Sequence, residues 1–173
     1  DKGQWCYVDP NCRDLAGGAK VNGQASWKMC SPEQDTMLRE YKAADLFWFA
    51  DDQAVMMPLL NKMAYPLSQH RWADVSSYWG VSIDDLDPES VRIFPFEMDL
   101  VKEWLGFKWG NKSTVLDEAT AAEMKRIADS NVPTTFDMSA DHMPPHVIVQ
   151  NRTVNVVMPV KNYVICLAGC PPK

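Results

Sequence analysis

The sequence predicts an α-rich α+β fold within one domain. Apolar residues recur at helical spacing through much of residues 33–130, whereas β-branched runs are confined to residues 146–170. Helices that precede strands in this way favour an α+β arrangement over a doubly wound sheet. Of the 173 residues, 46% are hydrophobic and 23% are charged, which is the balance of a globular domain with a core.

The predicted elements follow one another in three parts. Residues 1–32 are expected to be irregular and cysteine-rich, with turn-forming pairs throughout and a short hairpin at residues 21–24. A helix is expected to start at Ser31, which is a candidate N-cap followed by Pro32, and its apolar residues continue to Trp48. Further helical segments are expected over residues 52–63, 71–78, 97–107 and, most clearly, 117–130. Short antiparallel strands are expected over residues 146–149, 154–158 and 163–167.

Charge and hydropathy exclude two classes of partner. The net charge is −6 and there is no basic stripe, so binding to a phosphate backbone is disfavoured. No run of apolar residues reaches the roughly 18–20 that span a bilayer. The most apolar stretch, residues 43–60, is interrupted by Asp45, Asp51, Asp52 and Pro58, and we expect it to lie against a partner or a membrane surface.

The cysteines lie only at the two ends of the chain. They are Cys6, Cys12, Cys30, Cys166 and Cys170. Their spacing matches no standard zinc finger, so disulfides are favoured over reduced thiols or a metal site. We expect at least one bridge between the two clusters, because closing a long loop gives the largest entropic stabilisation, about 4–5 kcal/mol. One cysteine is left over. Two sequons, at Asn111 and Asn151, are consistent with glycosylation in an exported protein.

One local string resembles known segments. Residues 5–12 read Trp-Cys-Tyr-Val-Asp-Pro-Asn-Cys, and Ser-Trp-Lys-Met-Cys follows at residues 26–30. The string resembles short Trp-Cys-Tyr-Val-Asp-Pro segments of exported and membrane-facing proteins of unicellular algae and protists. It is also similar to the Trp-Cys-Tyr strings of kringle modules, but it lacks their ladder of six cysteines. The algal and protist resemblance covers about thirty residues and implies an extracellular or organelle-lumen location, the thylakoid lumen included, with Trp5 and Trp27 packed on a bridge that contains Cys6. It implies no catalytic residue.

The best candidate metal site is the segment from Asp137 to His146. Its ligands would be Asp137, Asp141, His142 and His146, and a metal ion is the one cofactor that the sequence suggests. The alternative is a loop with two surface histidines, because Pro144 and Pro145 prevent a helix that would place both imidazoles on one face. His70 lies between polar and aromatic residues and is expected to be structural. No catalytic motif is present, so the sequence favours a protein that is not an enzyme.

Two aromatic runs hold more aromatic surface than one helix face can bury. The residues concerned are Phe47, Trp48, Phe49, Trp104, Phe107 and Trp109. Either they form a small core, or part of each run is exposed to a protein partner. We therefore expect a non-catalytic structural or interaction subunit that docks on a larger assembly, for which the algal resemblance implies an extrinsic subunit of a photosynthetic membrane complex. The alternatives are a metal- or small-molecule-binding protein that uses the Asp137–His146 loop, and a hydrolase with His70 or His142 as its base.

Overall fold

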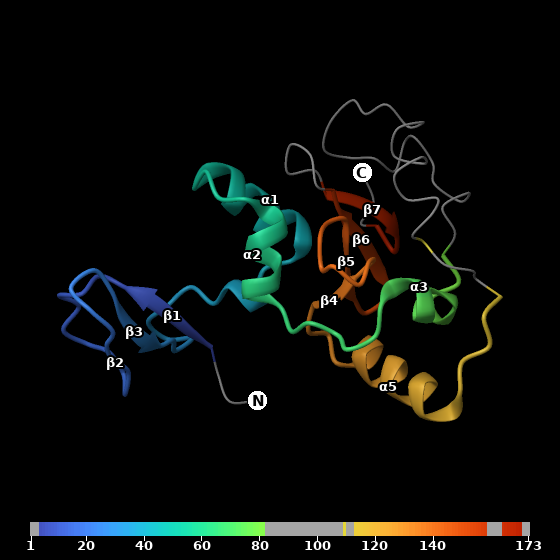
Figure 1. The fold of residues 1–173 in the computed structure, drawn as a ribbon, viewed down its shortest axis with the longest axis horizontal. Helices are drawn as coiled ribbons and strands as arrows, with labels where there is room; N and C mark the ends of the chain where they lie inside the picture. The colour runs from blue at the N-terminus through green and yellow to red at the C-terminus, as the bar shows by residue number, and fades with distance from the viewer. Residues whose placement is uncertain (1–3, 82–108, 110–112, 159–163, 171–173) are drawn as a thin grey trace. The chain divides into compact units, whose positions relative to one another are not determined.

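A computed structural model of the chain describes residues 4–81, 109, 113–158 and 164–170 (Figure 1). The chain forms two compact units, Asp1–Leu38 and Arg39–Lys173, and each is described by itself. The sequence predicts one domain of 173 residues, with a cysteine-rich N-terminal segment that ends at residue 32. In the described part of the chain, no helix is long and apolar enough to cross a bilayer.

The N-terminal unit is a small antiparallel sheet and is not irregular as expected. Strands β1 (Trp5–Val8), β2 (Ala19–Lys20) and β3 (Ser26–Met29) lie in the order β1-β3-β2. The hairpin turn expected at residues 21–24 connects β2 and β3. Two hydrogen bonds close it: the backbone N–H of Asn22 donates to Ala25 O, and the Asn22 side chain accepts from the N–H of Ala25. Gly18 is needed beside this hairpin, since a Cβ there would lie 2.0 Å from the carbonyl oxygen of Trp27.

In the C-terminal unit, the helices follow the predicted order with shifted boundaries. They are α1 (Ala43–Asp52), α2 (Met57–Ala64), α3 (Trp72–Val75) and α5 (Glu118–Asp129), with 3-10 turns at Leu38–Glu40 and Ser76–Tyr78. The helix expected to start at Ser31 starts only at Ala43, and the Asp35 carboxylate instead accepts from Lys28 Nζ and from the Ser31 N–H. The helix expected over residues 117–130 is confirmed, with Asp117 as its N-cap. The helix expected over residues 97–107 lies outside the described residues.

A four-stranded antiparallel sheet forms the centre of this unit. Its strands are β4 (Thr134–Asp137), β5 (His146–Gln150), β6 (Thr153–Val157) and β7 (Val164–Ala168), paired in chain order. The three strands expected near the C-terminus are confirmed, while β4 was not expected. Successive residues of β5 point to opposite faces, yet His146, Val147, Ile148 and Val149 are all buried. The sheet is therefore covered on both faces.

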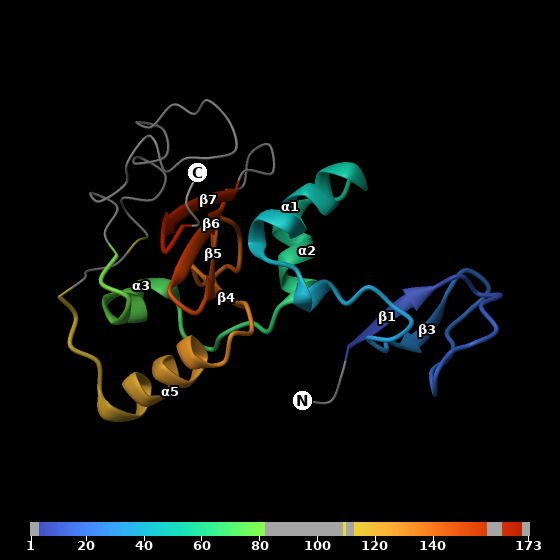
Figure 2. The ribbon, with the colours of Figure 1, turned by 180° about the vertical axis from the view of Figure 1, so that it is seen from behind.

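Different helices cover the two faces. On one side α3 and α5 lie against the sheet, and on the other side lie α1 and α2; Figure 2 shows the same order from behind. We call these the α5 face and the α2 face. The α5 face is apolar and carries Phe136, Val147, Val149, Val154, Val156 and Ile165, which pack with Met124 and Ile127 of α5. The α2 face is more polar and includes Thr135, Asp137, His146 and Asn155.

The disulfide pairing differs from the expectation. Cys166 at the end of β7 is bonded to Cys170, four residues further along the chain. Because both C-terminal cysteines are used in this bond, the expected bridge between the two ends of the chain is wrong. In the N-terminal unit, the sulfur atoms of Cys6 and Cys30 lie close to each other.

Trp72 is the centre of the aromatic core, and its removal should be costly. The ring is fully buried, and its centroid lies 5.4 Å from that of Trp79, 5.3 Å from Trp109 and 5.8 Å from Phe136. We expect Trp72→Ala to lower the free energy of unfolding by about 3–5 kcal/mol, because it leaves a large cavity. Urea unfolding followed by circular dichroism measures the loss. Trp48→Ala is the control, since its 53% exposed side chain should cost about 0.5 kcal/mol or less, and equal losses would contradict this assignment of the core.

Candidate functional site

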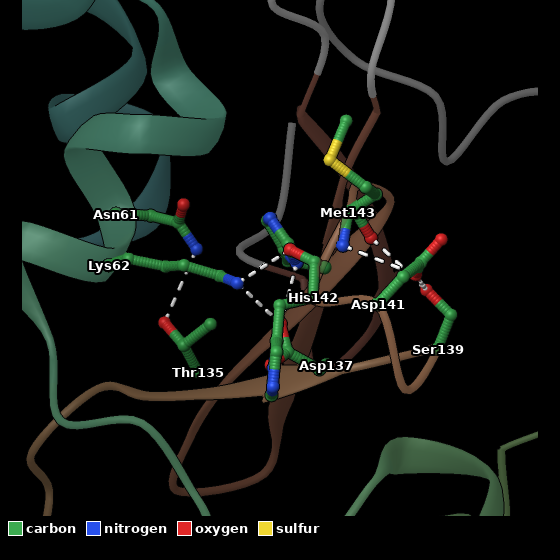
Figure 3. Close-up of polar contacts among 9 residues, drawn as sticks. Asn61, Lys62, Thr135, Asp137, Ser139, Asp141, His142 and Met143 are labelled. Atoms are coloured by element: carbon green, nitrogen blue, oxygen red, sulfur yellow. Dashed lines mark hydrogen bonds and ion pairs between the residues drawn. The ribbon is translucent and has the colours of Figure 1, made fainter.

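Asp137 is the centre of a polar cluster on the α2 face of the sheet (Figure 3). Its side chain is only 6% exposed. One carboxylate oxygen, Oδ1, lies 2.7 Å from Lys62 Nζ and 3.1 Å from His146 Nδ1, and the other, Oδ2, contacts His142 Nδ1. A carboxylate buried to this extent needs such partners, because an unbalanced charge in a low-dielectric environment is strongly unfavourable.

The chain brings these groups together from distant positions. Asp137 ends β4 and pairs in register with His146, the first residue of β5, so the intervening loop returns to the same place. Lys62 comes from α2, and its ammonium also donates to the carbonyl oxygen of His142 at 2.7 Å. Beside it, Asn61 Nδ2 donates to Thr135 Oγ1 at 3.3 Å. Helix α2 is therefore joined to β4 and to the loop by polar contacts as well as by packing.

The cluster holds its charges in defined states. Burial alone would raise the pKa of Asp137, but hydrogen bonds from His142 and Lys62 outweigh it and hold the pKa below the ordinary 3.8. Burial, reinforced by the positive charge of Lys62, lowers the pKa of His146 to about 4. At neutral pH the cluster therefore contains an ionised Asp137 and a neutral His146.

The loop between β4 and β5 presents His142 to solvent. His142 has a left-handed backbone (φ 58°) and a side chain that is 69% exposed. Asp141, the fourth predicted metal ligand, instead bonds within the loop, where its carboxylate accepts from Ser139 Oγ and from the Met143 N–H. The structure thus brings Asp137, His142 and His146 together and leaves Asp141 aside. Within the described ranges, no group of three or more histidine, cysteine or acidic side chains is arranged to hold a metal ion.

His70, the other histidine considered as a base, lies elsewhere. Its Nε2 is 3.1 Å from Glu123 Oε2 on α5, and its backbone N–H donates to Ser68 Oγ. The sequon residue Asn151 lies in the turn between β5 and β6, where its side-chain Nδ2 donates to Asn131 Oδ1 at 2.7 Å. Asn111 lies outside the described residues.

The structure separates the predicted partner-binding aromatics. Phe47 and Trp109 are 1% and 3% exposed, so the expectation that they face a partner is wrong. Phe47 lies on the side of α1 that packs inward, and Trp109 Nε1 donates to Val81 O inside the core. Trp48 is 53% exposed and remains a candidate, with Phe49 half-buried beside it. Trp104 and Phe107 lie outside the described residues.

A different aromatic surface is exposed on the N-terminal sheet. In the register of β1 and β3, Trp5 lies opposite Met29 and Tyr7 opposite Trp27, so all four side chains share one face. With Val21 they line a groove of about 470 Å³. Trp5 is 56% exposed and Tyr7 62%, and their rings meet edge to face at 5.1 Å. We call these five residues the N-terminal aromatic surface.

A second exposed apolar surface lies on α2. Met56, Leu59 and Met63 recur at helical spacing and are 63%, 54% and 62% exposed. The opposite side of the helix carries the buried residues Met57, Leu60, Asn61 and Ala64. We call the exposed residues the α2 stripe. Two of its residues, Met56 and Leu59, belong to the stretch 43–60 that the sequence predicts to lie against a partner or a membrane surface.

Comparison with known proteins adds no assignment. No protein-family model, curated protein or solved structure matches the chain. The residues alone therefore carry the functional argument.

Two groups of functional residues were not expected from the sequence. The sequence does not predict the contact of Lys62 with Asp137, because Asp137 lies 75 positions further along the chain and no local pattern connects the two residues. Trp5 and Trp27 were expected to pack on a bridge that contains Cys6, although the alternation of Trp5 and Tyr7 with Cys6 and Val8 is a signal for a strand with an aromatic face.

Acid should destabilise the C-terminal unit through His146. The folded-state pKa of about 4 lies below the ordinary 6.5, so the unfolded chain binds the proton first as the pH falls. The contribution of neutral His146 to the free energy of unfolding is fully present above pH 6.5 and is lost between pH 6.5 and about 4. This loss is on the order of 2–3 kcal/mol. Urea unfolding across this range measures the slope. His146→Asn should flatten it, whereas His70→Asn should not, and an unchanged slope in His146→Asn would contradict the assignment.

Proposed function

We propose that this chain is a non-catalytic interaction protein that binds a protein partner through the N-terminal aromatic surface. The observation that carries the proposal is the exposure of Trp5 and Tyr7 beside Trp27 and Met29 in one continuous groove. Large aromatic side chains gathered on one face are typical of the centres of protein interfaces. Monomeric proteins seldom leave such a surface in water.

The chemistry of the groove supports a neutral, apolar ligand. The described residues that line the groove are all uncharged. The charged residue of β3, Lys28, lies on the other face of the sheet, where it is 2.7 Å from Asp35. Tyr7 and the two tryptophans combine a large apolar area with a polar group, a combination that suits apolar or proline-rich segments of proteins. The α2 stripe offers a further contact of the same kind.

The surface should bind apolar dyes and promote self-association of the isolated chain. We expect Trp5→Ala and Tyr7→Ser each to lower the fluorescence of a bound naphthalene-sulfonate dye by at least about twofold, because each removes apolar contact area. Because unfolding of the sheet would also remove the groove, amide hydrogen exchange over residues 4–30 is needed to show that each variant keeps its fold.

Val115→Ser is the matched control, since Val115 is 93% exposed and lies outside both surfaces. It should leave dye binding unchanged. Sedimentation velocity over a range of concentrations gives the second measurement. A wild-type chain that stays monomeric and binds no dye would overturn the proposal.

One specific observation favours a second function, proton transfer at His142. Asp137 Oδ2 contacts His142 Nδ1, while the imidazole is largely exposed. A carboxylate that orients a solvent-facing histidine is the base half of many hydrolytic sites. On this basis His142 would accept a proton from water during hydrolysis of an ester or amide.

This second function can be separated from the reactivity of any surface histidine. If His142 is a base, His142→Gln should lower the hydrolysis rate of an activated aryl ester by at least about tenfold. The paired control is His70→Gln, because His70 also contacts a carboxylate, that of Glu123. Equal rates in the wild type and both variants would remove this candidate.

A further inference from the structure

The N-terminal unit has too little apolar core for its size. Small units with little apolar burial usually need a disulfide, a metal or a partner to fold. Among its described residues, Met37 is the only hydrophobic side chain that is fully buried. The large apolar residues of its strands, Trp5 and Tyr7, are exposed. Something other than burial must therefore hold the sheet together.

Two cysteines are placed to do this. Cys6 lies on β1 opposite Lys28, and the backbone N–H of Cys30 donates to Gln4 O at 2.8 Å, which extends the β1–β3 pairing by one step. Cys6 and Cys30 are thus diagonal neighbours on the face opposite the aromatic surface. Their sulfur atoms are 2.7 Å apart. This distance is shorter than the roughly 3.5–4.0 Å of a non-bonded contact and approaches the length of a covalent bond.

The third cysteine of the unit, Cys12, makes a different contact. Its Sγ donates to the carbonyl oxygen of Asp14 at 3.3 Å, and it forms no disulfide with another described residue. These observations favour a structural bridge over a catalytic or metal-binding role.

We propose that Cys6 and Cys30 form a disulfide that stabilises the N-terminal sheet, with Cys12 remaining as the free thiol. The oxidant is a low-molecular-weight disulfide such as oxidised glutathione. The Cys6 thiolate attacks one sulfur of the oxidant, whose S–S bond breaks and releases one thiolate. The Cys30 thiolate then attacks Cys6 Sγ and releases the second. The two cysteines lose two electrons and two protons, and the two released thiolates accept the protons.

Peptide mapping without reduction tests the pairing on the intact wild-type chain. The chain is first equilibrated with reduced and oxidised glutathione, and its free thiols are then blocked with N-ethylmaleimide. We expect a cross-linked peptide pair that contains Cys6 and Cys30, and a single maleimide adduct on Cys12. Alkylation of Cys6 and Cys30 in the folded protein, or a bridge from Cys12 to either of them, would overturn the proposal.

Hydrogen exchange tests the stabilising role. In Cys6→Ser and Cys30→Ser, amide exchange over residues 4–30 should accelerate by about 100-fold, because the unfolded chain regains the freedom that the bridge removes. Cys12→Ser is the matched control and should exchange like the wild type. Exchange that stays unchanged in all three variants would contradict the role of the bridge even if the bridge forms. Neither measurement depends on dye binding, so each proposal can fail without the other.

Discussion

The carboxylate of Asp137 lies on a sheet face that helices cover, and a negative charge in that position has to be balanced. Lys62 provides the balance, and in doing so it fixes the rotation of α2 about its own axis. With Asn61 and Lys62 directed to the sheet, Met56, Leu59 and Met63 point to solvent. The same carboxylate holds His142 and thereby closes the loop between β4 and β5. One buried charge therefore determines both where the loop lies and which side of α2 faces solvent.

The N-terminal unit solves a different physical problem. Among its described residues it has no covered sheet face of comparable apolar content, and Lys28 Nζ forms an ion pair with Asp35 Oδ1 at 2.7 Å. Trp5, Tyr7, Trp27 and Met29 all lie on the exposed face, and Val8 is the one aliphatic side chain of β1 and β3 on the other face. The stability of the sheet therefore has to come from contacts on that other face. That face carries Cys6, Lys28 and Cys30. The division leaves the aromatic residues free to contact another molecule at the cost of apolar burial within the unit.

The sequence predicts the elements whose signal is local. Strands β5 to β7 follow from β-branched runs, and α5 follows from the helical period of its apolar residues. Strand β4 escapes prediction because Thr134–Asp137 is too short to show a period, and its place is set by pairing with β5. The helix expected from Ser31 fails because Asp35 makes a tertiary contact with Lys28. Phe47 and Trp48 are adjacent in sequence, yet only one is buried, and this depends on the phase of α1 against β7, a long-range property.

The distribution of polar and apolar groups favours binding over catalysis. Asp137 already contacts three cationic or hydrogen-bonding side chains, and its low pKa leaves it a weak base. His146 is neutral and buried, which removes it from contact with a substrate. In this cluster only His142 both contacts the Asp137 carboxylate and has a side chain that is largely exposed to solvent. By contrast, the α2 stripe exposes apolar area, and the N-terminal aromatic surface exposes tryptophan and tyrosine side chains that would lose little freedom on binding relative to the apolar area they bury. The polar cluster is thus better placed to position α2 than to act on a substrate, and the exposed apolar residues are where a partner would gain the most binding energy.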